Sequence, residues 1–180
     1  MPVTNPDEFE DCMEMARTLL GGCDGAGDLW EANERVNRAL RLRPTEAEAW
    51  ILKSQILSSL DDDVAALAAS EMAVRRAPRT AEAHYVRSAV LADMERYPDA
   101  LKAVERAFRN SGPGDDWLLE DLYYEKAAIL DALHRSDDAL ATFEAGLARC
   151  PESQLLKAGI EPLRRERTRR SFRVIDGGLR

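Results

Sequence analysis

Hydrophobic and polar residues follow each other along this chain with the period of short amphipathic helices. Between residues 47 and 80 two such stretches are adjacent, and their apolar positions are Trp50, Ile51, Leu57 and Leu60, then Val64, Leu67, Met72 and Val74. Spacings of three, four and seven residues place apolar side chains on one face of a helix. Asp61, Asp62 and Asp63 separate the stretches and supply turn and N-cap residues. The pattern predicts two helices joined by a short turn.

This helix pair recurs with a period of 34 residues. Pro44 and Pro78 are separated by that interval, Gly112 follows at the same interval, and Pro151 comes 39 residues later. The longer last interval indicates an insertion at 115–119, so the predicted units are 13–46, 47–80, 81–114 and 120–153. Proline at position 32 of a unit ends the second helix, because proline has no backbone N–H to donate.

Two further positions of the unit are small in all four copies. Position 20 is Ala32, Ala66, Ala100 and Ala139. Position 27 is Ala39, Ala73, Ala107 and Gly146. Small residues at these points allow the second helix of a unit to approach the first closely.

With a large residue at position 4, a small one at position 8 and leucine at position 11, the unit resembles the tetratricopeptide repeat family. The residues that carry the resemblance are Trp50, Ser54, Leu57, Ala66, Ala73 and Pro78, and again Tyr123, Ala127, Leu130, Ala139, Phe143, Gly146 and Pro151. Departures from the family pattern are Lys53, Arg87 and Lys126 at position 7 and Ser70 at position 24. The resemblance implies an all-α, right-handed α-solenoid of helix-turn-helix repeats whose concave face binds other proteins.

Segments at both ends extend the array into a single domain predicted over 1–170. Thr4 or Asn5 is expected to cap a helix that runs to about Leu20 and forms the first helix of the first unit. Ser153 is expected to cap a helix over 154–170 that covers the last repeat. Because Pro162 lies inside it, a kink or restart is predicted near Glu161. Residues 171–180 are predicted to form a flexible tail.

Charge is distributed unevenly along the 180 residues. The chain carries −8, but residues 154–180 carry +5, which leaves −13 for residues 1–153. Such a body repels nucleic acid, so nucleic acid is disfavoured as a partner. No apolar run has the length of a membrane span. Three cysteines without paired spacing indicate a reducing, cytoplasmic location rather than a disulfide framework.

Catalytic and metal-binding motifs are absent from the sequence. His84 takes the large-residue position 4 and is expected to pack between helices, whereas His134 falls in a predicted turn. Neither histidine has further ligands at metal-site spacing, and the glycine-rich stretch 21–28 follows no strand. The sequence therefore predicts no enzyme, no cofactor and no small-molecule substrate.

The resemblance places positions 2, 5, 9, 12 and 13 of each unit on the concave face. The candidate groove residues are accordingly Ile51, Gln55, Tyr85, Tyr124, Glu48, Glu82, Asp93, Asp121 and Asp131. A carboxylate at position 2 has an alternative role, since it complements the helix dipole, and each tyrosine has the alternative of covering a neighbouring helix. The expected partner is a basic or neutral peptide with apolar anchors. The lysine and asparagine pattern that binds acidic chaperone tails in this family is missing.

Two features outside the groove are secondary contact candidates. Trp117 in the insertion either packs on the third unit or presents an apolar anchor. Arg164, Arg165, Arg169 and Arg170 form part of an arginine-rich run. This run is a solvated helix end, a contact to an acidic partner or to the protein's own groove, or a contact to a polyanion. An adaptor, a scaffold or a chaperone-like protein fits the whole pattern, and a small acidic secretion-type chaperone is a narrower alternative.

Overall fold

A computed structural model describes residues 6–177, with side chains described for residues 8–168. Over this part the chain forms nine helices in sequence. They are α1 (Pro6–Gly21), α2 (Ala26–Leu42), α3 (Ala47–Ser59), α4 (Asp63–Arg76), α5 (Ala81–Asp93), α6 (Tyr97–Asn110), α7 (Asp116–Ala132), α8 (Ser136–Arg149) and α9 (Gln154–Gly177). The predicted helix pairs and their order are confirmed. Thr4 and Asn5, the predicted capping residues, lie outside the described residues.

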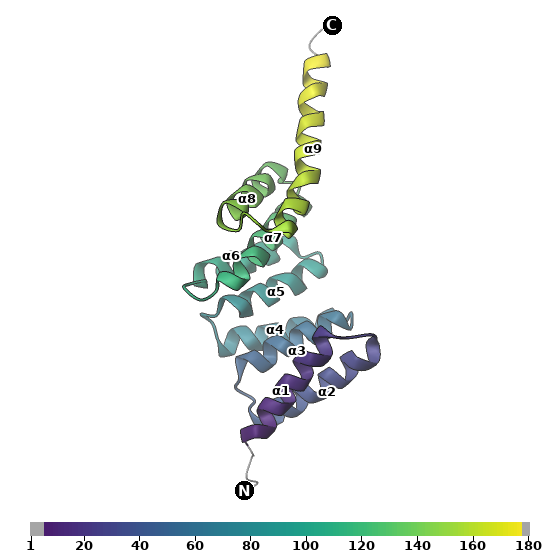
Figure 1. Ribbon diagram of the computed structural model, residues 1–180, viewed down its shortest axis with the longest axis vertical. Coiled ribbons are helices and arrows are strands. Elements are labelled where there is room, and N and C mark those ends of the chain that lie inside the picture. The colour runs from purple at the N-terminus through teal and green to yellow at the C-terminus, as the bar shows by residue number, and fades with distance from the viewer. Residues whose placement is uncertain (1–5, 178–180) are drawn as a thin grey trace.

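The helices form four antiparallel hairpins that stack into an elongated array, with α9 after the last hairpin (Figure 1). Each odd-numbered helix packs against the even-numbered helix that follows it and also contacts the next odd-numbered helix. Within the described residues, the even-numbered helices α2, α4, α6 and α8 make no close backbone contact with each other. The odd-numbered helices therefore line the inner side of the curve.

Small residues inside each hairpin allow the close packing that the sequence predicts. Ala66, Ala73, Ala100 and Ala107 are fully buried. A Cβ added at Gly146 would lie 2.8 Å from the Cβ of Tyr123, so glycine is required there. Two buried hydroxyls also join the helices of a hairpin, because Ser54 Oγ donates to Ala66 O at 2.8 Å and Ser88 Oγ to Ala100 O at 3.0 Å.

The side chains at position 4 join each hairpin to the preceding one. Trp50 Nε1 donates to Pro44 O at 3.0 Å, and His84 Nε2 lies 2.9 Å from Pro78 O. Since a carbonyl oxygen only accepts, Nε2 of His84 carries the hydrogen. His84 is buried, as predicted, while Trp50 is half-buried against three hydrophobic clusters. Both residues therefore hold the inter-repeat link in place.

The turn inside the last three hairpins has one geometry. Asp61, Glu95 and His134 all stand at position 15 of their units, with φ of 58°, 57° and 59°. The following residue closes the turn in each case, for example Arg96 N donating to Leu91 O at 2.8 Å. This is the left-handed helix end that usually carries glycine, because a Cβ is strained there.

Glu95→Gly is expected to stabilise the chain by about 0.5–1 kcal/mol, because glycine removes the left-handed strain but loses more backbone freedom on folding. Denaturant unfolding measures the change. Glu95→Ala, which keeps the Cβ, is the matched control and should leave the midpoint close to that of the wild type. Equal midpoints for all three chains would show that the turn is unstrained.

The first hairpin differs in register from the other three. Helices α3, α5 and α7 end at position 13 of their units, but α1 ends at Gly21, which the predicted unit 13–46 numbers as position 9. The helix predicted to run to about Leu20 is confirmed, but it ends four residues earlier in its unit than the first helices of the other units do. The glycine-rich loop after Gly21 absorbs the shift, and α2 begins three residues before the equivalent point of α4.

Helix α9 covers the end of the array as predicted, but it is longer. Ser153 Oγ accepts from Leu156 N at 3.0 Å, and Leu156, Ile160 and Leu163 are buried against the last hairpin. The predicted restart near Glu161 is wrong, since one helix continues through Pro162 to Gly177. The predicted tail 171–180 thus begins within helical backbone, and residues 178–180 lie outside the described residues.

Candidate functional site

Side chains of consecutive odd-numbered helices meet along the inner side of the array. Arg17 of α1 forms an ion pair with Glu48 of α3. Ser58 Oγ of α3 donates to Asp93 Oδ2 of α5 at 3.1 Å. We call this inner surface of α1, α3, α5 and α7 the concave groove. Its residues come from positions that the sequence analysis assigned to the concave face.

A hollow of about 280 Å³ lies at the N-terminal end of the concave groove. It brings together four predicted residues, Glu48, Ile51, Gln55 and Glu82, with Arg17, Leu20, Gly21 and Leu52. Ile51 is only 4% exposed, so it forms part of the floor and is not a projecting contact. The hollow therefore combines an apolar floor with charged walls.

Further along the groove, Tyr85 lies among carboxylates. Burial raises the pKa of Tyr85, and the neighbouring charges of Asp121 and Glu125 raise it further. Glu125 was missed by the sequence analysis. It stands at position 6, where the two preceding units have the buried residues Leu52 and Val86, and a glutamate at a position that is otherwise apolar was the available signal.

The pKa of Glu125 lies well above the ordinary value for a glutamate. The pKa of Glu125 is raised to about 7, and burial is the largest cause. The hydrogen bond with Ser88 opposes this rise, whereas the charges of Asp93 and Asp121 add to it. Ser88 Oγ is 3.0 Å from Ala100 O and 3.3 Å from Glu125 Oε1. A hydroxyl has one hydrogen, and the equivalent Ser54 gives its hydrogen to Ala66 O. Ser88 therefore shares its hydrogen between Ala100 O and Glu125 Oε1, and the longer bond to Glu125 offsets only part of the effect of burial.

The acidic residues at position 2 are not explained by the helix dipole alone. Burial raises the pKa of Glu82, and the charge of Glu48 raises it further. Glu82 lies in the first turn of α5, where the helix dipole alone would lower its pKa. Asp121 lies well inside α7, because the insertion lengthens that helix, and burial raises its pKa too. A favourable dipole would lower both pKa values. The groove therefore holds more carboxylates than Arg17 neutralises, although Arg17 pairs with Glu48 and also lowers the pKa of Glu82.

The remaining predicted groove residues lie toward the C-terminal end. Tyr124 is 36% exposed and packs edge-to-face on Phe143, with ring centroids 6.0 Å apart. Tyr124 thus covers a neighbouring helix, which was the alternative role considered for it, and it also keeps an exposed edge. Asp131 is exposed and accepts a hydrogen bond from Ser136 Oγ at 3.0 Å.

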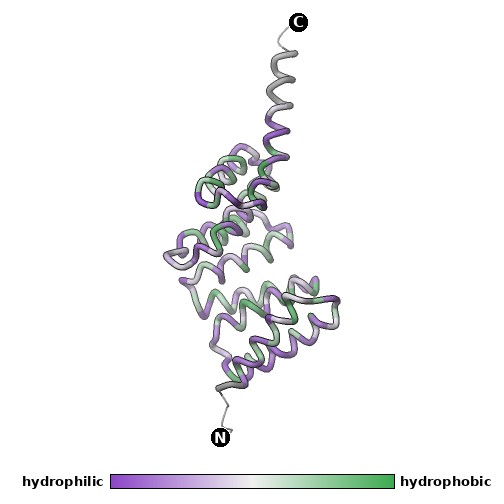
Figure 2. Tube along the Cα trace, in the orientation of Figure 1, coloured by the Kyte–Doolittle hydropathy of each residue, from purple (hydrophilic) through white to green (hydrophobic). Residues whose placement is uncertain are grey.

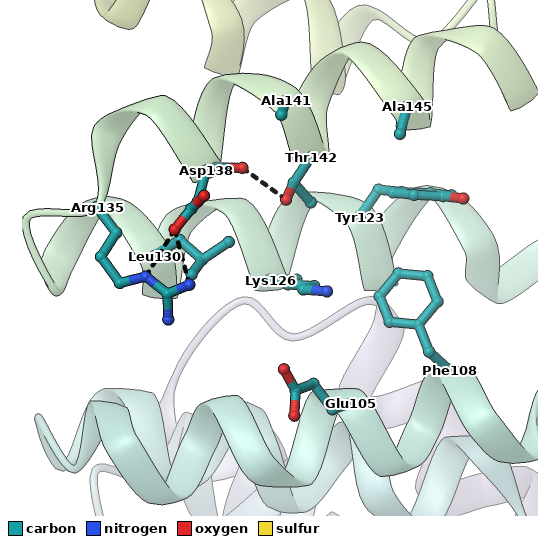
Figure 3. A pocket seen from close by; sticks show the side chains of 10 residues that line it. All are labelled: Glu105, Phe108, Tyr123, Lys126, Leu130, Arg135, Asp138, Ala141, Thr142 and Ala145. Carbon is teal, nitrogen blue, oxygen red and sulfur yellow. Dashed lines mark hydrogen bonds and ion pairs between the residues drawn. The ribbon is translucent and has the colours of Figure 1, made fainter.

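A second hollow of about 450 Å³ lies between α6, α7 and α8 and was not predicted (Figure 3). Phe108 and Tyr123 pack edge-to-face at 5.0 Å beside it, and Lys126 lies 5.6 Å from the Phe108 ring centroid. Arg135 and Asp138 are ion-paired at its edge. Small residues on α8, Ala141 and Ala145, leave this space open. None of the predicted groove residues lines it.

The secondary contact candidates are exposed. Trp117 is 60% exposed, so the expectation that it packs on the third unit is wrong. Arg164 lies 3.6 Å from Glu144, and Arg165 lies 3.8 Å from Glu161, both at the surface. The side chains of Arg169 and Arg170 lie outside the described residues.

Both histidines of the chain lie in the part that the structure describes. The described residues contain no group of three or more His, Cys, Asp or Glu side chains that could hold a metal ion. His84 is occupied by Pro78 O, and His134 is exposed in a turn. Over the same part of the chain, no helix has the length and apolar character needed to cross a membrane.

Comparisons with known proteins identify the fold. No protein-family model matches the chain, and no curated protein matches it. Among solved structures it is similar to TTC0263, a thermophilic TPR protein of Thermus thermophilus, with a TM-score of 0.75 and 21% identity over 88% of this chain and 82% of that chain. The chain has the tetratricopeptide repeat (TPR) fold.

Two other solved structures share this fold. PilF of Pseudomonas aeruginosa gives a TM-score of 0.76 with 15% identity, over 90% of this chain and 70% of that chain. YrrB, described as a TPR protein with an unusual peptide-binding site, gives 0.64 with 18% identity, over 91% of this chain and 80% of that chain. The all-α solenoid predicted from the sequence is confirmed, and the TPR fold defines the odd-numbered helices as the first helix of each repeat.

Proposed function

We propose that this TPR chain is a non-enzymatic interaction module that binds a segment of a partner protein in its concave groove. The segment is basic or neutral and carries apolar anchors. The observation that carries this proposal is the row of groove carboxylates with raised pKa values, in which Asp121 and Glu125 lie near Tyr85 and Glu82 lies near Glu48. An adaptor, scaffold or chaperone-like role follows from such binding.

A cationic side chain in the groove would relieve the repulsion among these carboxylates. Positive charge within about 4–6 Å of a carboxylate lowers its pKa, so Glu125 would release its proton on binding. The exposed edges of Tyr85 and Tyr124 offer aromatic surface for apolar or cationic anchors. The 280 Å³ hollow at the N-terminal end accepts a small apolar side chain over Ile51 and Leu52.

The comparisons support a peptide or protein as the ligand class. YrrB is itself described as having a peptide-binding site. A Thermobaculum terrenum O-GlcNAc transferase is also similar, but this chain covers only 27% of it, so no catalytic role is carried over. The free cysteines, with Cys23 exposed, are consistent with the reducing cytoplasm that we propose as the location. A secretion-type chaperone is the narrower form of the same proposal.

The test is affinity capture from native lysate, read by mass spectrometry. The wild-type chain is compared with Tyr85→Ala/Tyr124→Ala, which removes two aromatic side chains from the groove. The matched control is Trp30→Ala/Trp117→Ala, which removes two exposed aromatic side chains elsewhere. We expect a protein captured by the wild type and the control but not by the groove variant.

Folding of the groove variant is checked by thermal unfolding, because Tyr85 is half-buried. If that variant unfolds, Glu48→Lys/Asp93→Lys replaces it, since both carboxylates are exposed. Capture that survives in both groove variants and is lost in the tryptophan control would contradict the proposal and place the binding site near Trp30 or Trp117.

The groove should not bind the acidic C-terminal tails that some TPR proteins recognise. The lysine and asparagine expected at positions 5 and 9 are here Ile51 and Gln55 in the second unit and Tyr85 and Ala89 in the third, and the groove carboxylates oppose association with an acidic tail. Titration of the chain with an acidic-tail peptide is expected to show no saturable binding at low salt. Micromolar affinity for that peptide would show that the groove charge has been misassigned.

A further inference from the structure

Helix α9 extends beyond the repeat array by more than two turns. The first helix of the second, third and fourth repeats ends at position 13, and counting from Gln154 puts position 13 of α9 at Glu166. The helix continues to Gly177, which adds about 16 Å at 1.5 Å per residue. Figure 1 shows this part of α9 rising away from the hairpins. We call residues 164–177, which follow the last buried side chain described for α9, the overhang.

The overhang is basic and follows the last buried residue of the helix. Leu163 is buried, whereas the described side chains of residues 164–168 are exposed. In Figure 2 the helix turns purple, the colour of hydrophilic residues, where it leaves the body. The overhang sequence contains six arginines against two carboxylates, a net charge of +4, and also Phe172, Val174 and Ile175. It is therefore a basic segment with apolar residues, the chemistry expected of a ligand of the concave groove.

The overhang cannot reach the groove of its own chain in this structure. The start of α9 is fixed by Ser153, whose Oγ donates to Glu120 Oε1 of α7 at 2.7 Å, and by the buried Leu156 and Ile160. From there one uninterrupted helix runs outward. Occupation of its own groove would require α9 to break or detach, so a basic segment held this way is presented to another molecule.

We propose that the overhang of one chain binds the concave groove of a second copy of this chain. This inference rests on the proposed function of the groove and names one occupant for it. The groove offers Glu48, Glu82, Asp93, Asp121 and Glu125 against the arginines. Ala89, Ala92 and Ala128 lie along the same helices, and their small side chains are not buried. Because the two surfaces differ, the contact is head-to-tail and grows with concentration.

The test is sedimentation velocity of the full-length chain over a range of concentrations at low and high salt. Arg165→Glu/Arg167→Glu lowers the net charge of the overhang from +4 to 0, and Glu48→Arg/Asp93→Arg replaces two of the groove carboxylates with cations. All four side chains are exposed, so both variants should fold. Arg75→Glu/Arg76→Glu, on the exposed end of α4, is the control with the same charge change as the overhang variant.

We expect the wild type and the control to exceed the 20.1 kDa monomer mass as concentration rises at low salt. Each reversed variant alone should remain monomeric, with association weakened roughly tenfold or more. Mixing the two variants should restore association, because the unchanged overhang of the groove variant then meets the unchanged groove of the overhang variant. A wild type that is monomeric at every concentration, or association that survives both reversals, would overturn the inference.

Failure of this inference is distinguishable from failure of the proposed function. If the wild type is monomeric but the lysate partner is still lost in Tyr85→Ala/Tyr124→Ala, the groove binds another protein and only the self-association is wrong. A monomeric wild type that binds duplex DNA through Arg165 and Arg167 would also overturn the inference and assign the overhang to a polyanion. If the groove variants alter neither readout, both proposals fail.

Discussion

Glu125→Gln is expected to stabilise the chain by about 2–3 kcal/mol at pH 8 and to change its stability little at pH 5. Glutamine has nearly the shape of glutamic acid, and its side-chain amide oxygen can accept from Ser88 Oγ as the carboxylate does. Urea unfolding of both chains at the two pH values measures the difference. This effect is large because the pKa of Glu125 is much higher in the folded chain than in the unfolded chain.

The direction follows from the folded and unfolded pKa values of Glu125. The folded pKa is about 7, against an ordinary value of 4.5. Between these values the unfolded chain loses the proton while the folded chain keeps it, so stability falls as pH rises from about 4.5 to 7. Glutamine carries no such proton and avoids the loss.

The control for this prediction is Glu152→Gln, because the Glu152 side chain is 95% exposed. Glu152→Gln should change the free energy of unfolding only slightly, and by the same amount at pH 5 and at pH 8. A Glu125→Gln chain whose stability relative to the wild type is the same at both pH values would show that Glu125 is ionised throughout, and the charge of the groove would have to be reassigned.

Gly159→Ala is expected to destabilise the chain by about 1–3 kcal/mol, the usual cost of overpacking. A Cβ at Gly159 would lie 2.6 Å from the Phe143 ring and 3.2 Å from Cε2 of Tyr124. Phe143 is buried, so the ring has little room to move and α9 must shift away from α8. Denaturant unfolding measures the loss.

The matched control is Gly27→Ala. Gly27 is also helical, in α2, but nothing lies within 4 Å of an added Cβ. Alanine there should stabilise by up to about 1 kcal/mol through helix propensity. Opposite signs at the two glycines would confirm that α9 is held by close packing. A Gly159→Ala chain as stable as the wild type would mean that α9 is loosely attached.

The repeat architecture was predictable because local patterns determine it. Small residues at positions 20 and 27 and the proline at position 32 mark each hairpin whatever its neighbours are. In the first repeat, the end of the first helix near Leu20 was also predictable, because Gly21, Gly22, Gly25 and Gly27 interrupt the apolar period there. Pro162 was expected to restart α9, but the burial of Ile160 and Leu163 on either side holds the helix through it.

The groove was predictable in outline but not in its details. Register assigned Glu82, Tyr85 and Asp121 to the concave face, and all three lie on the odd-numbered helices α5 and α7. Glu125 was missed because its effect depends on the burial and charges contributed by a neighbouring helix, which no single repeat encodes. The exposure of Trp117 could not be predicted, because the direction of a side chain in an insertion depends on the fold around it.

The carboxylates of the concave groove lower the stability of the chain near neutral pH. A buried carboxylate with a raised pKa costs folding free energy once the pH exceeds its ordinary value. Residues that lower stability in this way are typical of functional sites. Glu82, Asp121 and Glu125 lie on two consecutive odd-numbered helices of the groove, which concentrates the cost where a cationic ligand would offset it.

The central claim is tested most directly by the affinity of the captured partner for three chains, measured by isothermal titration calorimetry. We predict binding at least about tenfold weaker, or about 1.4 kcal/mol, for Tyr85→Ala/Tyr124→Ala than for the wild type. We predict unchanged affinity for Trp30→Ala/Trp117→Ala. Unchanged affinity for the groove variant together with weaker binding of the tryptophan variant would show that the concave groove is not the binding site.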